Sequence, residues 1–186
     1  MMYKLNSIQQ LFVSCNQPAK AIIGGRGVGK TTAMCIDIVR NLVADIPIVV
    51  IVPDVQYQKE LFEPKLKEVA KEYGVDVSGV KYYQAKYIRG GRLIPQHYSE
   101  YIYIPSLART FPCDKDTSLQ VIKEYLETLG HIVSRYNVRI DYHPGYFIKS
   151  HFTEFLEKQF TTFKATFEDN AMNLPNNYPM EQANDN

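Results

Sequence analysis

The sequence predicts an α/β fold in which a mainly parallel sheet is flanked by helices. The first indication is a glycine-rich turn at 24–31, which joins the apolar run 21–23 to a stretch, 32–43, with apolar residues at helical spacing. The second is the continuous run 48–52, because β-branched residues without alternation are typical of a strand covered on both faces. A strand, a helix and a strand in this order form a βαβ unit, whose crossover is almost always right-handed.

The glycine-rich turn satisfies the phosphate-loop (Walker A) pattern of a glycine, four residues and then Gly-Lys-Ser/Thr. With one further threonine it reads Gly24-Gly25-Arg26-Gly27-Val28-Gly29-Lys30-Thr31-Thr32. Glycines allow the tight turn in which backbone N–H groups surround a phosphate, and the following helix adds its positive N-terminal end. Lys30 is expected on the β- and γ-phosphates, and the Thr31 hydroxyl on a Mg²⁺ ion. The turn therefore predicts a P-loop NTPase of the RecA-like type.

Length and composition fit one such domain. Of the 186 residues, we predict that 1–169 form the domain and that 170–186, which lack periodicity, form a disordered tail. No apolar run approaches membrane-spanning length, so no membrane partner is expected. The cysteines are scattered and odd in number, which favours a reducing compartment such as the cytoplasm. The net charge of +1 argues against a uniformly basic nucleic-acid binder.

Periodicity predicts the other elements. In chain order they are a helix at about 6–14, a helix at about 56–73, a strand at 100–107, a loop at 108–117, a helix at 118–129 and a strand at 131–142. Pro64 is expected to restart the second of these helices and Gly74 to end it, and Gly130 follows the third. Phenylalanines between 147 and 167 lie close to helical spacing, which indicates a core face or a surface that docks a partner.

The segment 81–98 is basic and rich in tyrosine, and it contains no acidic residue. Its candidate nucleic-acid contacts are Lys81, Lys86, Arg89 and Arg92. Cations for phosphates beside aromatic faces for bases are typical of a nucleic-acid track. The alternative is a twisted hairpin of strands at 82–88 and from 93 onward, joined by a turn at 89–92, with solvated cations. The sequence leaves both interpretations open.

Nucleotide hydrolysis also needs a carboxylate at the end of a strand to hold the Mg²⁺ shell. Asp54 follows the run 48–52, but it comes directly after the first crossover strand. Asp141 lies near the end of the strand expected at 131–142, and Glu124 lies in an expected helix. We therefore prefer Asp141 as the catalytic acid.

Two glutamines, Gln9 and Gln10, precede the phosphate loop. A glutamine amide donates and accepts hydrogen bonds at once, which matches the edge of adenine. The alternative is that both side chains are solvated.

Several of these segments resemble the large terminase subunit, the ATPase motor that packages DNA into tailed-phage capsids. The segment 6–14, followed by 21–32 with its Gly-Gly-Arg-Gly-x-Gly-Lys loop, resembles the start of that subunit. The strand at 49–53 with Gln56 behind it looks like the second motif of terminases and related helicases. The segment 100–107 is similar to the later strand that precedes the family's acidic motif. The resemblance spans roughly 5–108.

The resemblance implies roles for individual residues. Lys30 and Thr31 would bind the phosphates and Mg²⁺ of ATP, Gln9 or Gln10 would contact adenine, and Arg26 would be a transition-state arginine. It also implies double-stranded DNA as a partner, a homo-oligomeric ring, other packaging proteins, and the host cytoplasm if the protein is viral. The paired Asp-Glu motif expected after Leu107 is not evident, and the chain is shorter than subunits that carry a nuclease domain.

The sequence thus favours an ATP-binding, DNA-translocating or packaging ATPase. One alternative is a P-loop small-molecule kinase, with Asp54 as the acid and Arg89 and Arg92 in a lid. Another is a non-hydrolysing, nucleotide-gated assembly protein.

Overall fold

The computed structural model describes residues 3–25, 29–89, 101–144 and 149–165. Six strands form one sheet in the order β3-β2-β4-β5-β1-β6, and every neighbouring pair is parallel. The strands are β1 (Ala19–Ile23), β2 (Ile48–Val52), β3 (Lys81–Gln84), β4 (Tyr101–Ile104), β5 (Asn137–Tyr142) and β6 (Thr161–Lys164). This sheet confirms the predicted α/β fold. The predicted tail at 170–186 lies outside the described residues.

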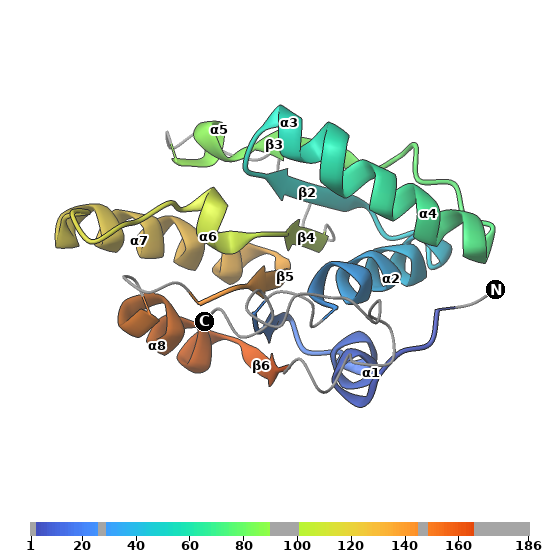
Figure 1. Ribbon diagram of the computed structural model, residues 1–186, viewed down its shortest axis with the longest axis horizontal. Helices are drawn as coiled ribbons and strands as arrows, with labels where there is room; N and C mark the ends of the chain where they lie inside the picture. Colours follow the sequence, from blue (N-terminus) through green and yellow to red (C-terminus); the bar gives the residue numbers. More distant parts are fainter. Residues whose placement is uncertain (1–2, 26–28, 90–100, 145–148, 166–186) are drawn as a thin grey trace, which may run out of the picture.

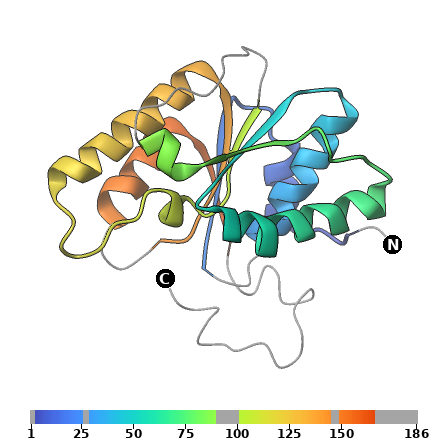
Figure 2. The same ribbon diagram turned by 90° about the horizontal axis from the view of Figure 1, so that it is seen from above.

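Helices cover both faces of the sheet, as Figures 1 and 2 show. The helical elements are α1 (Ser7–Ser14), α2 (Lys30–Val43), α3 (Val55–Tyr57), the π-helical η1 (Gln58–Phe62), α4 (Glu63–Tyr73), α5 (Ala85–Arg89), α6 (Leu107–Thr110), α7 (Leu119–Arg135) and α8 (Lys149–Gln159). One hydrophobic core lies between the sheet and α1, α2 and α4. A second core lies between the opposite face and α7 and α8. Burial on both faces explains the uninterrupted apolar run of β2.

Local signals explain where several helices begin and end. The Asn6 side chain accepts the backbone N–H of Gln9, and the Gln9 side chain accepts the backbone N–H of Asn6, which is a capping box for α1. Pro64 lies in the first turn of α4, and Gly74 ends that helix in the left-handed conformation at φ 66°. Both predictions for this helix are confirmed.

The predicted strand at 82–88 is wrong in its second half. β3 ends at Gln84, and the following residues form α5, which buries Ala85 and Ile88 on one side. Spacing of three residues places these two side chains on one face of a helix, whereas a strand would separate them. The rest of the proposed hairpin, at 90–100, lies outside the described residues.

Two further boundaries differ from the prediction. α7 continues through Gly130 to Arg135, so the strand expected from 131 begins at Asn137 instead. A glycine inside a helix costs about 1 kcal/mol relative to alanine, and the burial of Leu129 and Ile132 on either side of it offsets that cost.

The phenylalanine stripe at 147–167 belongs to a helix and a strand. α8 ends at Gln159, and the next residues form β6, which pairs with β1 at the edge of the sheet. Phe152 and Phe160 are buried in the core against α7 and β5, whereas Phe163 packs against Phe12 in the core on the opposite face of the sheet, so the described phenylalanines belong to both cores. Helical spacing alone does not reveal the change to a strand.

A buried polar cluster ties α2 to three strands. Asp37 on α2 accepts a hydrogen bond from the Lys20 ammonium on β1 at 2.6 Å, Nζ to Oδ1, and another from the Tyr103 hydroxyl on β4. The Arg139 Nε on β5 lies 3.7 Å from Oδ2 of the same carboxylate. Asn41, one turn further along α2, donates to the Tyr103 hydroxyl at 2.6 Å. The cluster therefore sets the rotation and the axial position of α2 on the sheet.

The two cations that share Asp37 have additional partners. Lys20 Nζ donates to the carbonyl of Phe12 at 2.8 Å, and Arg139 Nη1 donates to the carbonyl of Pro18 at 2.9 Å. Burial lowers the pKa of Lys20, and the Asp37 charge opposes that shift. Asp37 is thus the counter-charge for two side chains that are almost fully buried.

No helix in the described part of the chain combines the length and the apolar character needed to cross a membrane.

Replacing Asp37 with alanine should lower the free energy of unfolding by about 3–5 kcal/mol, because Lys20 and Arg139 would keep their charges in the core without a counter-charge. Urea unfolding followed by circular dichroism measures the change. The control is Glu154→Ala, which breaks an exposed ion pair with Lys158 and should cost less than about 1 kcal/mol. Equal losses in the two variants would contradict a stabilising role for the cluster.

Candidate nucleotide-binding site

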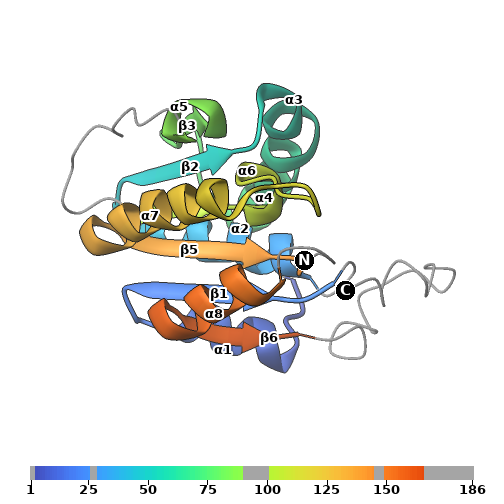
Figure 3. The same cartoon turned by 90° about the vertical axis from the view of Figure 1, so that its left-hand side faces the viewer.

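The described residues of the predicted phosphate loop, which are 24, 25 and 29–31, follow β1 and begin α2 at the carboxyl edge of the sheet (Figure 3). β1 ends at Ile23, and the Gly24 N–H donates to the Tyr142 carbonyl at the end of β5 at 3.0 Å. Gly29 caps α2 at φ 83°, a left-handed conformation that strains any residue with a Cβ. Thr31 and Thr32 follow in the first turn of α2. Arg26, Gly27 and Val28 lie outside the described residues.

Lys30 folds back into its own loop. Its Nζ donates to the carbonyl oxygens of Gly24 at 2.7 Å and Gly25 at 2.6 Å. Burial lowers the pKa of Lys30, and the negative charge of Asp141 opposes the shift. The ammonium is therefore held within the turn that the sequence predicts for phosphates.

Asp141 comes from the strand next to the phosphate-loop strand. It pairs in register with Ile22 of β1, and the residue is only 5 % exposed. Its Oδ1 accepts the backbone N–H of Ser106 at 2.9 Å, whereas Oδ2 has no hydrogen-bond partner in the described part of the chain. Burial raises the pKa of Asp141, while Lys30 and the Ser106 N–H act in the opposite direction. A buried carboxylate thus lies within the electrostatic reach of Lys30.

The other acids considered from the sequence lie elsewhere. Asp54 is half-exposed at the end of β2, where it caps α3 by accepting the Tyr57 N–H at 2.7 Å and forms an ion pair with Arg109 at 3.6 Å. Glu124 is exposed on α7. Among these candidates, only Asp141 interacts with Lys30.

The end of β4 carries no carboxylate. The strand runs to Ile104 and is followed by Pro105 and Ser106. Ser106 has φ 57°, which is uncommon for a residue with a side chain and indicates local backbone strain. Sequence reasoning missed this residue, because its contact with Asp141 uses the backbone N–H, which every residue except proline has.

Gln9 is buried and contacts the phosphate loop. Its Oε1 accepts the Asn6 N–H at 2.9 Å, and its Nε2 donates to the Gly29 carbonyl at 3.0 Å. Gln10 is exposed, and its Nε2 donates to the Leu5 carbonyl at 3.0 Å. The sequence predicts that one of the two contacts adenine. At Gln9 this contact would compete with the hydrogen bond from its side chain to the Gly29 carbonyl, which joins α1 to the loop.

The structure separates the predicted nucleic-acid contacts. Lys81 begins β3 at the amino edge of the sheet, whereas Lys86 and Arg89 lie on α5 at the carboxyl edge. Lys86 Nζ lies 5.1 Å from the ring centre of Tyr87, and Arg89 Nη1 donates to the Thr110 carbonyl at 2.5 Å. Arg92 lies outside the described residues. α5 follows β3, which lies four positions from β1 in the sheet. The two strands are therefore about 19 Å apart.

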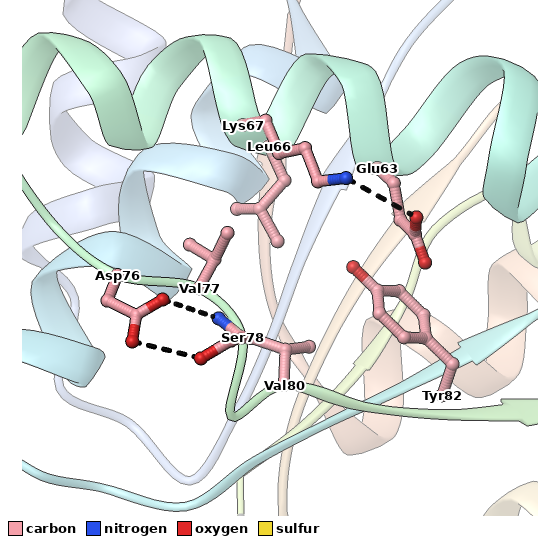
Figure 4. Close-up of a pocket in the computed structure, with 8 residues that line it drawn as sticks. All are labelled: Glu63, Leu66, Lys67, Asp76, Val77, Ser78, Val80 and Tyr82. Carbon is pink, nitrogen blue, oxygen red and sulfur yellow. Dashed lines mark hydrogen bonds and ion pairs between the residues drawn. The ribbon is translucent and has the colours of Figure 1, made fainter.

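A pocket of about 360 Å³ opens between α4 and the segment that leads into β3 (Figure 4). Its charged groups are engaged locally, since Lys67 lies 4.0 Å from Glu63, and Asp76 accepts hydrogen bonds from the backbone and side chain of Ser78. The residues that line it include none from the phosphate loop, α2 or β5. The pocket therefore lies apart from the predicted phosphate loop.

No three His, Cys, Asp or Glu side chains in the described ranges are grouped so that they could hold a metal ion. Mg²⁺ in nucleotide sites is bound by one or two protein groups together with phosphates and water, so such a group is not required. Thr31 and Asp141 are the described residues that fit this donor set.

The comparison with protein-family models gives no match, and neither does the comparison with curated protein sequences. Solved structures match in fold. The large terminase from a thermophilic bacteriophage aligns with a TM-score of 0.62 at 12% identity, over 94% of this chain and 48% of that chain. This chain therefore spans about half of the length of that terminase.

Two further structures show the same likeness. The large terminase ATPase domain of Thermus phage P74-26 aligns with a TM-score of 0.58 at 14% identity, over 92% of this chain and 84% of that chain. The SWI2/SNF2 ATPase core of Sulfolobus solfataricus, solved in complex with double-stranded DNA, aligns with a TM-score of 0.53 at 11% identity, over 100% of this chain and 47% of that chain. The chain has the fold of a P-loop ATPase domain. At the level of fold, its predicted resemblance to the large terminase is confirmed.

Gln9→Ala should weaken the binding of ATP and GTP by the same factor, about fivefold, because it removes a hydrogen bond to the Gly29 carbonyl of the loop. Fluorescence titration with labelled ATP and GTP measures both affinities. Gln10→Ala is the matched control, since its side chain donates to the backbone before α1 and not to the loop. A loss confined to ATP in the Gln9 variant would instead identify an adenine contact.

Proposed function

We propose that the protein is an ATPase that binds ATP and Mg²⁺ in its phosphate loop and acts on double-stranded DNA. The observation that carries the proposal is the placement of Lys30 and Asp141 on adjacent elements at the carboxyl edge. Ligands of parallel α/β sheets bind at this edge. The fold of the terminase ATPase domains supports the same assignment, and the large terminase of the thermophilic bacteriophage has also been solved with ATP-gamma-S.

The proposed chemistry divides among residues of the loop and the adjacent strand. Backbone N–H groups of the loop bind the phosphates, and Lys30 exchanges the carbonyls of Gly24 and Gly25 for phosphate oxygens. The Thr31 hydroxyl and the Asp141 carboxylate would hold the Mg²⁺ ion, and Arg26 would stabilise charge in the transition state. Mg²⁺, when bound, neutralises charge on the phosphate oxygens.

The second part of the proposal is that the protein acts on double-stranded DNA. Its support is the double-stranded DNA in the complex of the SWI2/SNF2 core, together with the cations of α5 at the carboxyl edge. We propose DNA translocation or packaging as the output, residues 1–169 as the ATPase domain, and a homo-oligomeric ring with other packaging proteins as the working assembly.

One observation favours a second candidate, a nucleotide-gated assembly protein that does not hydrolyse ATP. β4, the strand that resembles the one before the acidic motif of terminases, is followed by Pro105 and Ser106 instead of acids. ATP turnover by the purified chain, measured with and without double-stranded DNA, separates the two. Turnover that DNA stimulates supports the motor, and tight binding without turnover supports the assembly protein.

Lys30→Ala should lower ATP affinity or turnover at least tenfold, about 1.4 kcal/mol, because it removes the ammonium that the loop holds. Isothermal titration calorimetry and phosphate release measure the two quantities. The control is Lys71→Ala, on the exposed surface of α4. A folded Lys30 variant with unchanged binding and turnover would refute the nucleotide assignment.

Lys86→Ala should lower the slope of log affinity for duplex DNA against log salt by about one unit, because each phosphate contact releases condensed counterions. Fluorescence anisotropy over a salt series measures the slope. Lys81→Ala is the matched control, since this exposed lysine of the same segment lies at the opposite edge of the sheet. Equal slopes for the wild type and the Lys86 variant would remove α5 from the DNA contact.

A further inference from the structure

We propose that the acidic pair Glu168 and Asp169, which follows β6, binds in the phosphate loop of its own chain and competes there with the phosphates of a nucleotide. The pair would make the loop self-inhibited, which goes beyond the proposed function but rests on it for the nucleotide. Both acids lie outside the described residues. The inference therefore rests on their sequence and on the described residues to which they are attached.

The end of β6 lies beside the start of the phosphate loop. β6 pairs in parallel with β1, and Lys164 is opposite Ile23. The next residue, Ala165, donates its N–H to the Ile23 carbonyl at 2.8 Å. Gly24, the first residue of the loop, follows Ile23 directly. The described chain therefore ends next to the predicted phosphate site.

The acidic pair is attached to this point by a very short segment. Glu168 and Asp169 follow Ala165 by three and four residues. An extended chain covers about 3.3–3.6 Å per residue, so the two backbones can reach about 10–14 Å from Ala165. The Lys30 ammonium is bound to the Gly24 carbonyl at 2.7 Å, and Gly24 follows the residue that pairs with the end of β6. Both carboxylates can therefore reach Lys30 without any change in β6.

The Lys30 ammonium has no direct anionic partner in the described part of the chain. It donates to two neutral groups, the carbonyls of Gly24 and Gly25, and Asp141 acts on it through space. An ammonium removed from water is stabilised when an anion approaches. The first turn of α2, which begins at Lys30, adds its own partial positive charge. The loop thus favours an anion within reach, whether a carboxylate or a phosphate.

Charge is divided unevenly along the sequence. All 21 lysines and arginines precede residue 166, together with 16 of the 20 acidic residues, so residues 1–165 have a net charge of +5. Residues 166–186 contain four acidic residues and neither lysine nor arginine, so their charge is −4. Attraction between the two parts favours contact. Glu168 and Asp169 are preferred over Glu181 and Asp185, because a short tether gives a higher effective concentration at the loop.

The contact is weak enough for a nucleotide to displace it. Asp141 has the same charge as the acidic pair, so it opposes the contact with Lys30. An ion pair open to solvent changes an equilibrium by about fivefold at most. A nucleotide offers several phosphate oxygens to the loop at once. We therefore expect the acidic pair to lower nucleotide affinity and not to abolish it.

The experiment compares Glu168→Gln/Asp169→Asn with the matched variant Glu181→Gln/Asp185→Asn, which loses the same charge from the same segment. Isothermal titration calorimetry on the full chain measures the affinity for ATP with Mg²⁺ and for pyrophosphate in EDTA. We expect the first variant to bind both ligands about fivefold more tightly than the wild type, and the second to match the wild type. The ratio of affinities should approach one at high salt, which screens the contact.

Hydrogen exchange without nucleotide tests the contact directly. Backbone amides of the loop exchange more slowly while a carboxylate binds them. Peptides that cover 24–31 should therefore exchange faster in Glu168→Gln/Asp169→Asn than in the wild type, and at the wild-type rate in Glu181→Gln/Asp185→Asn.

Four results would overturn this inference. They are equal affinities in the wild type and Glu168→Gln/Asp169→Asn, weaker binding in that variant, an equal gain in both double variants, and unchanged exchange of the loop. In each case nucleotide binding by the wild type would leave the proposed function intact. If neither the wild type nor either variant binds ATP or pyrophosphate, the proposed function itself is refuted. Binding by Glu168→Gln/Asp169→Asn alone would support both.

Discussion

The buried carboxylate of Asp37 is the interaction on which the arrangement of the site depends. It contacts side chains from β1, β4 and β5, so it fixes α2 against the centre of the sheet. α2 begins at Lys30, about two helical turns before Asp37. Holding the helix at Asp37 therefore also sets where Lys30 and the first turn of α2 lie relative to the ends of β1 and β5.

Two buried aspartates, Asp37 on α2 and Asp141 on β5, differ in how completely their carboxylates are hydrogen-bonded. Asp37 is satisfied by Lys20, Tyr103 and Arg139, whereas Asp141 has one oxygen without a hydrogen-bond partner among the residues that the structure describes. The first arrangement pairs a buried carboxylate with two cations, whereas the second leaves one oxygen of a buried carboxylate without a hydrogen bond, which is costly. Proteins retain unfavourable local features of this kind mainly at functional sites. This is the reason for choosing the carboxyl edge as the candidate nucleotide-binding site in preference to the pocket beside α4.

α6 connects this edge to neighbouring elements through direct contacts. Ser106, which caps α6, donates to Asp141; Arg109 forms an ion pair with Asp54 at the end of β2; and the Thr110 carbonyl accepts a hydrogen bond from Arg89 of α5. The contacts form a continuous path from Asp141 on β5 to the helix α5. This path crosses the sheet at its carboxyl edge, where a parallel sheet brings all its loops together.

Local sequence determined much of this protein: the phosphate loop, the buried strand β2, and the helix ends set by Asn6, Pro64 and Gly74. These features depend on backbone geometry and on contacts within a few residues. The tertiary structure alone decided that β6 is a strand, that α7 passes through Gly130, and that β5 lies between β1 and β4. Alternation within β5 places Asp141 on the same face as Arg139, but strand order arises from pairing between distant segments. Only that order brings Asp141 beside the phosphate loop and onto the Ser106 N–H, because neither contact leaves a pattern in the local sequence.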